Sequence, residues 1–354
     1  MKKTLIALAV LATAGSVNAA QIYGSDTSKV SLKGEIDSYI SNWDSDATST
    51  KYDTDVDVWA KIQIDAEHQL NDMFTAFGSF EIEQGNGWKP ADNEANGAVF
   101  DDLYVGVKTD KWGVVLGEHG DWADSLDAIE KDDITNEGYY LSDSGGHHRE
   151  SKGHGVGFKA TVVDGLTFVA DVTTEQTDGL SNTYGASLNY DISNYSVGVA
   201  YQSGEATGGT TYNPDYYKGG ISASATFGGL FVAATYSAYE GVNSNFGFFD
   251  DAVTSGTYYE GNAYGVAVSY TVDSWKPYVT YGVMSNDKSY NSSTNTKSDV
   301  NNADVDNLLV GLQYTISDNL LTFIEYQTGS ADAGFTGSTD QDGDSWVWGT
   351  YYTF

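Results

Sequence analysis

The sequence predicts an all-β fold, a transmembrane antiparallel β-barrel of about 16 strands with short periplasmic turns and long extracellular loops. Three observations predict it. Apolar and polar residues alternate with a period of two over segments of about a dozen residues, longer than the ~5–6 residues of a usual strand. Short turns and long polar segments alternate between these segments. The chain also ends on an aromatic strand, "WVWGTYYTF", where little soluble structure would remain to cover it.

The first residues have the organisation of a secretory signal. Lys2 and Lys3 precede an apolar run of about a dozen residues, which is too short for a spanning helix of ~20. The small residues that follow include Val17-Asn18-Ala19, which fits a cleavage site. We therefore expect a signal peptide over residues 1–19 and a barrel over residues 20–354.

Composition excludes some classes of function. The formal net charge is -33 at pH 7. Removing Lys2 and Lys3 with the signal makes it more negative still, so nucleic acid is excluded as a natural partner. There is no cysteine, so no disulfide closes the fold. The chain has 40 glycines, 26 tyrosines and only 3 prolines, which is typical of many strands and turns. No linker interrupts the pattern, and we expect one domain.

The expected strands follow one another from residue 29 to the C-terminus. In 53–68, for example, Val56, Val58 and Ile62 share one face, whereas Asp57 and Lys61 share the other. A tilted strand of ~9–11 residues crosses a bilayer, so the apolar face is expected to meet lipid and the polar face the interior. The expected strands are 29–42, 53–68, 73–84, 99–108, 112–119, 153–162, 166–174, 182–190, 195–203, 217–227, 230–239, 261–270, 275–284, 303–314, 320–328 and 345–354.

The gaps between these segments predict the connectivity. Tight turns rich in Asp, Asn and Gly, such as "VDG", "DISN" and "GG", alternate with long polar segments. The longest of these segments is 120–152. The last strand is expected to pair with the first, because closure leaves lipid no unpaired backbone to meet. A soluble sandwich or propeller is the alternative, although its strands would be shorter and its apolar faces rich in Val and Leu.

From residue 20 to the last residue the chain resembles one family, the general diffusion porins of Gram-negative outer membranes. The resemblance rests on "AQIYGSDTSKVSLKG" at residues 20–34, on "VVDGLTF" at 162–168, and on a final Phe354 with Tyr352 two positions before it. It implies a sixteen-stranded barrel, a homotrimer, and a third loop folded into the lumen. It also implies that Tyr352 and Phe354 form the signal read by the barrel-assembly machinery, in a membrane of lipid and lipopolysaccharide.

The segment 120–152 has the ordinal place of that third loop. A loop this long without its own structure is usually functional, so we favour the lumen over a solvated acidic loop on the cell surface. In the lumen it would place a negative field across the pore. The acids expected at the constriction are Asp121, Asp124, Asp127, Glu130, Asp132 and Asp133.

The resemblance also implies basic residues on the wall that faces this loop. Position by position, these fall at Glu35, Lys61, Asp102 and, less directly, Arg149, so two of the expected bases are acids. The family's loop motif Pro-Glu-Phe-Gly-Gly is absent as well. Because charged rings in a water-filled pore select ions by sign, acids on both loop and wall predict a cation-selective pore.

The function expected from this resemblance is passive diffusion of ions and small hydrophilic solutes, without a cofactor or a metal. The alternative is a channel specific for sugars or oligosaccharides, which needs an aromatic track; Tyr39, Trp59, Phe77 and Tyr104 fall on the inward phase. An adhesin or phage receptor is also compatible with the long loops. We find no nucleophile elbow, phosphate loop or linked Ser-His pair, so no enzyme is expected.

Overall fold

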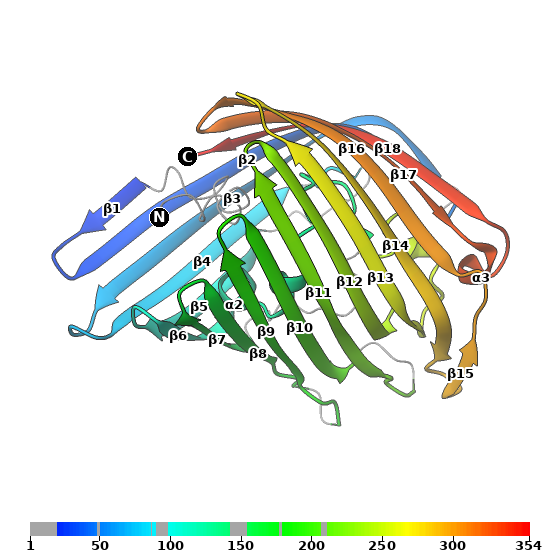
Figure 1. Ribbon diagram of the computed structural model, residues 1–354, viewed down its shortest axis with the longest axis horizontal. Coiled ribbons are helices and arrows are strands. Elements are labelled where there is room, and N and C mark those ends of the chain that lie inside the picture. Colours follow the sequence, from blue (N-terminus) through cyan, green and yellow to red (C-terminus); the bar gives the residue numbers. More distant parts are fainter. Residues whose placement is uncertain are drawn as a thin grey trace.

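The computed structural model describes residues 20–47, 50–85, 87–89, 98–141, 154–176, 179–206 and 211–354. The signal peptide expected over 1–19 lies outside them. The described strands form one antiparallel sheet of 18, of which sixteen close into a barrel and two, β1 (Ala20–Gly24) and β15 (Thr296–Asp299), lie outside the ring. Figure 1 shows the C-terminus towards one end of the barrel and β15 towards the other.

The sixteen barrel strands confirm the expected sixteen, each within a few residues at most ends. Every strand pairs with its neighbours in chain order, which is an up-and-down barrel. The strands are β2 (Ser28–Ser45), β3 (Thr50–Gln69), β4 (Thr75–Gly85), β5 (Val99–Lys108), β6 (Trp112–Glu118), β7 (Gly155–Val163), β8 (Leu166–Thr173), β9 (Thr183–Ile192), β10 (Tyr195–Glu205), β11 (Asp215–Phe227), β12 (Leu230–Val242), β13 (Thr257–Tyr270), β14 (Trp275–Asn291), β16 (Asp304–Ser317), β17 (Leu320–Ala331) and β18 (Gln341–Thr353).

The barrel closes where β18 meets β2, as expected from the sequence. Thr353 pairs with Glu35, and Phe354 then exchanges two backbone hydrogen bonds of 2.9 Å with Gly34. Directly beyond this point β1 takes over the same edge of β2, with Ala20 opposite Leu32. β1 and β18 thus pair with successive parts of the same edge of β2.

The two faces of the wall follow the alternation of the sequence. Val56 and Val105 on the outer face are 63% and 61% exposed, whereas Asp37 and Glu325 on the inner face are 4% and 1% exposed. An apolar outer band of this kind is what a bilayer covers. Among the described residues, no helix combines the length and the apolar character that crossing a membrane would require.

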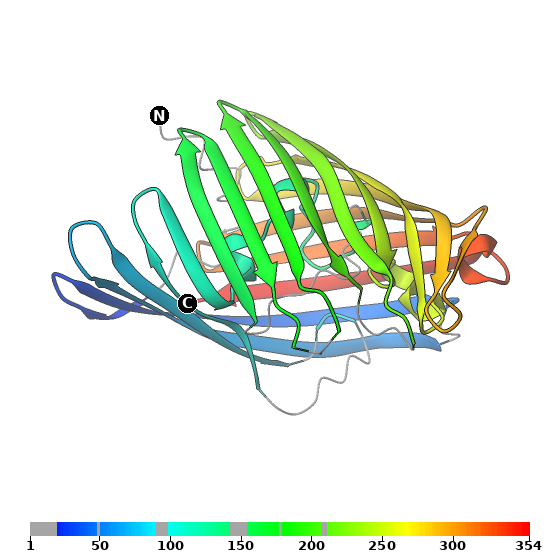
Figure 2. The ribbon, with the colours of Figure 1, turned by 90° about the horizontal axis from the view of Figure 1, so that it is seen from below.

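Short helical turns occur only in the connections between the described strands. They are α2 (Gly120–Ala123) and η1 (Leu126–Ile129) after β6, η3 (Gly247–Ala252) after β12, and α3 (Ala333–Thr336) after β17. We call the connection between β6 and β7 loop 3 and the connection between β12 and β13 loop 6, counting the long connections in chain order. In Figure 2, α2 and the coil that follows it lie within the ring of strands.

Candidate functional site

The candidate site is the interior of the barrel, which loop 3 crosses. Its described residues, 119–141, contact inward side chains on strands from β7 to β18. A loop can contact side chains on so many strands only if it runs through the interior. The path begins at β7 and β8, where Lys159 Nζ donates to the Trp122 carbonyl at 3.1 Å and Ser125 N–H donates to Asp171 Oδ2 at 2.6 Å.

The first half of the loop is held against β9, β10 and β11. Leu126, Ala128 and Ile129 of η1 form a buried cluster with Ala200. Gly198 makes this approach close, because a Cβ there would lie 1.7 Å from the Ala128 carbonyl oxygen. Any side chain at this wall position would therefore displace the loop.

The second half of the loop is anchored by a single wall carboxylate. Glu325 on β17 accepts hydrogen bonds from the backbone N–H groups of Asn136, Glu137 and Gly138 at 2.7, 3.0 and 2.9 Å. The Tyr278 hydroxyl donates to the same carboxylate at 2.6 Å. A carboxylate only accepts hydrogen bonds, and bonds to an ionised acceptor are stronger than neutral ones.

Between these anchors the loop packs with apolar side chains. Ile134 is buried in a cluster with Ala233, Ala267, Tyr278 and Leu309, which come from four different strands of the wall. Further along, Tyr139 N–H donates to Gln327 Oε1 at 3.0 Å, and its carbonyl accepts from Asn307 at 2.9 Å. The loop is thus fixed to the wall along most of its described length.

The acids expected at the constriction lie in different environments. Asp127 is exposed, Asp124 and Asp133 are half-buried, and Asp132 is 2% exposed. Glu130 lies 3.6 Å from the Nζ of Lys218, a fully buried lysine on β11 that sequence reasoning missed. The backbone of Asp121 belongs to α2, but its side chain lies outside the described part of the structure.

Two of the four expected wall residues lie side by side. Glu35 and Lys61 are paired partners on β2 and β3, and Lys61 Nζ lies 3.3 Å from Glu81 Oε1 on β4. Asp102 on β5 is buried, at 4% exposure. Arg149 lies outside the described residues.

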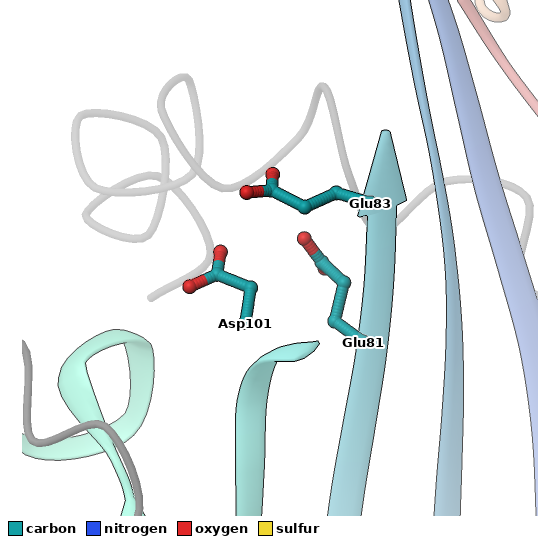
Figure 3. Close-up of side chains that lie close together, drawn as sticks. All are labelled: Glu81, Glu83 and Asp101. Carbon is teal, nitrogen blue, oxygen red and sulfur yellow. The ribbon is translucent and has the colours of Figure 1, made fainter. Parts of the chain in front are cut away.

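Three carboxylates gather beside Lys61 on the inner wall. Glu81 and Glu83 of β4 and Asp101 of β5 each offer an oxygen, and these oxygens lie within 4.8 Å of one another. Figure 3 shows the three side chains converging from the two strands. With Lys61 paired to Glu81, the group is a dense, partly neutralised patch of negative charge on the wall.

One loop acid has a strongly altered acidity. Burial raises the pKa of Glu137 to about 7, and the negative charges of Glu325 and Glu35 act in the same direction. The Tyr351 hydroxyl donates a hydrogen bond to this carboxyl group and opposes the shift in part. Nearby in the loop, burial lowers the pKa of Lys131, whose Nζ donates to Asn189 at 2.6 Å.

The four aromatic residues considered as a sugar track do not form one surface. Tyr39 is 4% exposed and its ring meets Tyr351 edge to face, and Phe77 is 8% exposed and packs on Trp122 of loop 3. Trp59 and Tyr104 are half-buried on β3 and β5. Two of the four rings are therefore covered by protein.

At the chain end, the two residues expected to form an assembly signal lie next to each other on the outside of the barrel. The rings of Tyr352 and Phe354 are 5.9 Å apart. A Cβ on Gly34 would lie 2.2 Å from the Phe354 ring, so the ring rests directly on the β2 backbone.

The sequence did not single out Glu325 and Lys218 as functional residues. Each is one charged residue at an inward position of its strand, and nothing else in the local sequence marks it. In "LLTFIEYQTG", Glu325 alternates with Ile324 and Tyr326, which are about half exposed on the outer face. The sequence thus shows that Glu325 points inward. It does not show that a loop almost 190 residues earlier brings its N–H groups to this carboxylate.

Known proteins support the same architecture. The family model described as Gram-negative porin matches residues 4–347. The outer membrane porin protein OmpD of Citrobacter koseri is 26% identical over 364 residues, with 94% of this chain and 93% of that protein covered. OmpD of Salmonella typhimurium is also 26% identical, with the same coverage.

Solved structures agree in fold at low sequence identity. OmpF of Salmonella typhi, in complex with daunomycin, covers 95% of this chain and is itself covered completely, with a TM-score of 0.68 and 15% identity. The trimer form of OmpT of Vibrio cholerae covers 93% of this chain and is fully covered, with a TM-score of 0.66 and 15% identity. An anion-selective porin of Comamonas acidovorans covers 92% and is also fully covered, with a TM-score of 0.68 and 13% identity.

Proposed function

This chain belongs to the Gram-negative porin family, and on that premise we propose that its barrel is a water-filled pore that prefers cations. The protein is an outer-membrane channel for passive diffusion and not an enzyme, in keeping with the family and its outer-membrane relatives. The proposal adds the sign of the ion preference, the residues that cause it and the assembly.

The observation that carries the proposal is the excess of acids at interior positions. The part of loop 3 between residues 120 and 141 has seven acids and one lysine. The inward positions of 33–37 and 55–67 have six acids and two lysines. A negative potential of several kT in a pore raises the occupancy of cations over anions. Since a porin of similar fold is anion-selective, the sign must come from side chains and not from the barrel.

In this account loop 3 is the constriction, and its acids act with those of the wall. Asp124, Asp127, Asp132 and Asp133 supply negative charge from the loop, while Glu35 and Asp102 supply it from the wall. Glu130 and Lys61 contribute less, because each is paired with a charge of opposite sign.

Neutralising interior acids tests this proposal. The triple variant Glu83→Gln, Asp101→Asn, Asp127→Asn removes three charges from the wall and the loop, so the preference for potassium over chloride should fall. The effect should be largest at low salt, where screening is weakest. The measurement is the reversal potential of single channels across a potassium chloride gradient.

The matched control removes three acids at the short turns, Asp72→Asn, Asp164→Asn, Asp318→Asn. This change alters the net charge equally but lies away from loop 3, and it should leave the preference nearly unchanged. Equal effects of the two triple variants would mean that net charge, and not the interior field, sets the selectivity.

We further propose that three copies assemble, as the trimer form of a similar porin does. The partners that follow from an outer-membrane barrel are lipid, lipopolysaccharide, the assembly machinery that reads Tyr352 and Phe354, and the small hydrophilic solutes and ions that pass. Mass measurement in mild detergent tests the trimer, and a monomeric mass would contradict it. No contact of the described residues favours a sugar-specific channel, because Tyr39 and Phe77 are covered by neighbouring rings.

A further inference from the structure

A second segment, besides loop 3, enters the interior. Loop 6 carries "NFGFFDDA" at residues 245–252, and the rings of Phe246, Phe248 and Phe249 are at most 2% exposed. We call residues 246–249 the loop-6 plug. These rings belong to the largest buried apolar cluster among the described residues, which includes wall residues of β2, β12, β13, β14, β16, β17 and β18.

Phe248 is the centre of the plug. Its ring lies 4.6 Å from Trp43 on β2 and 5.6 Å from Tyr139 of loop 3, measured between centroids. Its carbonyl accepts a hydrogen bond of 2.8 Å from the Ser45 hydroxyl. Trp88 of the second long loop lies 5.8 Å from Trp43 and closes the same cluster. Loops 2, 3 and 6 therefore meet on one part of the inner wall.

The wall has a socket for Phe248. A Cβ on Gly343 of β18 would lie 2.6 Å from the Phe248 ring, and a Cβ on Gly329 of β17 would lie 3.1 Å from it. These two glycines face each other in the register of β17 and β18. A glycine within a strand often marks a place where another group approaches closely, and at Gly343 that group is Phe248.

The other end of the plug is held by the last long loop. Phe246 lies 4.7 Å from Phe335 of α3 and 5.5 Å from Tyr259 of β13. The Tyr259 hydroxyl donates to the Phe335 carbonyl at 3.2 Å, and Phe246 N–H donates to Asp250 Oδ1 at 2.7 Å. Polar groups on both sides of the plug thus have partners within the protein.

The energetic balance favours a seated plug. Burying a phenylalanine side chain contributes about 1.5–3 kcal/mol relative to leaving it exposed, and aromatic pairs add ~0.5–1.5 kcal/mol each. These gains offset part of the entropy lost on ordering the loop, about 1–2 kcal/mol per residue. Burial of the three rings therefore favours the seated position of the plug.

We propose that loop 6 is a second constricting element of the pore, whose aromatic plug fills the interior beside β2, β12–β14 and β16–β18 and, with Tyr139 of loop 3, limits the size of solutes that pass. This inference rests on the proposed function, since a size limit has meaning only for a channel. In this inference the three phenylalanines limit the size of solutes and do not change the ion preference. The ion preference comes from the acids of loop 3 and the wall.

The test removes the rings and keeps the length of the loop. In the variant Phe246→Ser, Phe248→Ser, Phe249→Ser, single-channel conductance should rise by about 1.5-fold or more, since the cross-section available to ions grows. Larger polyethylene glycols should enter the pore and reduce its current, while the reversal potential stays near that of the wild type. The control Ser293→Gly, Thr294→Gly, Thr296→Gly changes exposed residues of the hairpin between β14 and β15, outside the ring, and should change neither quantity.

A second variant protects the test against misfolding. Gly343→Ala leaves all three phenylalanines in place but puts a methyl group where the Phe248 ring lies, so it should displace the plug and also widen the size limit. Heat-modifiable mobility in gels verifies that each barrel is folded. A wild-type protein without conductance would contradict the proposed function itself. If the wild type conducts and both plug variants have the same conductance and the same polymer size limit as the wild type, this inference alone is overturned.

Discussion

Glu325 illustrates at the scale of one residue how the interior is organised. It is a buried carboxylate on a wall strand, and it holds a loop rather than facing open water, because three consecutive N–H groups and the Tyr278 hydroxyl converge on its two oxygens. Hydrogen bonds to a charged group contribute about 1.5–3 kcal/mol each. The position of loop 3 therefore depends strongly on this side chain.

Replacing Glu325 by glutamine should release the loop from the wall. The substitution keeps the size but removes the charge, and its NH2 group would face loop N–H groups that need an acceptor. We expect protease cleavage within loop 3 of the folded barrel and increased noise in the open-channel current. Glu83→Gln removes a wall charge from the group with Glu81 and Asp101, and it serves as the control. A quiet, protease-resistant Glu325→Gln channel would show that the anchor is dispensable.

Alternation in the sequence was enough to assign residues to the inner or outer face. Asp57, Lys61 and Val56 all lie on the face that the period of two predicts. Contacts across the lumen were not accessible in this way. Lys218 meets Glu130 and Glu325 meets Asn136 only because the ring closes and loop 3 turns inward, and neither partner is marked in the local sequence.

At the scale of elements, long strands bounded by tight turns could be located from the sequence. Very short strands, and the extension of a strand beyond its alternating segment, could not. β1 and β15 have five and four residues, too few for a repeating pattern. β14 continues to Asn291, beyond the expected end at 284, because its last residues pair with β13 and with β15. The inward course of loop 6 carried no signal that distinguishes it from a solvated loop.

Loop 3 should respond to pH through Glu137. Its folded pKa of about 7 lies above its ordinary value of 4.5. The folded protein therefore binds this proton more tightly than the unfolded chain does, and the resulting stability, fully present below pH 4.5, is lost as pH rises through 7. The wild type should accordingly lose thermal stability between pH 5 and 8 by more than Glu137→Gln does.

The measurement is the midpoint of thermal unfolding in detergent at several pH values. The comparison with Glu137→Gln matters because the many other acids of the chain titrate in both proteins. Parallel curves for the two proteins would contradict the raised pKa of Glu137.

At the scale of the whole molecule, the barrel separates two requirements. Closure of β18 on β2 leaves the outer surface of the described barrel apolar and pairs each of its sixteen strands on both sides, which lipid demands. The interior is then available for charge and for the two inward loops. The apolar, paired wall could be predicted almost completely from the sequence, because the period-two alternation of apolar and polar residues specifies it. The second requirement depends on loops whose course is set by contacts between distant residues.

The most direct test of the account is the reversal potential of the purified wild-type protein in a planar bilayer with potassium chloride at unequal concentrations on the two sides. The account predicts stepwise conductance and a potential whose sign corresponds to preferential passage of potassium, larger at low salt. A membrane that stays insulating, or a potential with the sign of chloride preference, would contradict it.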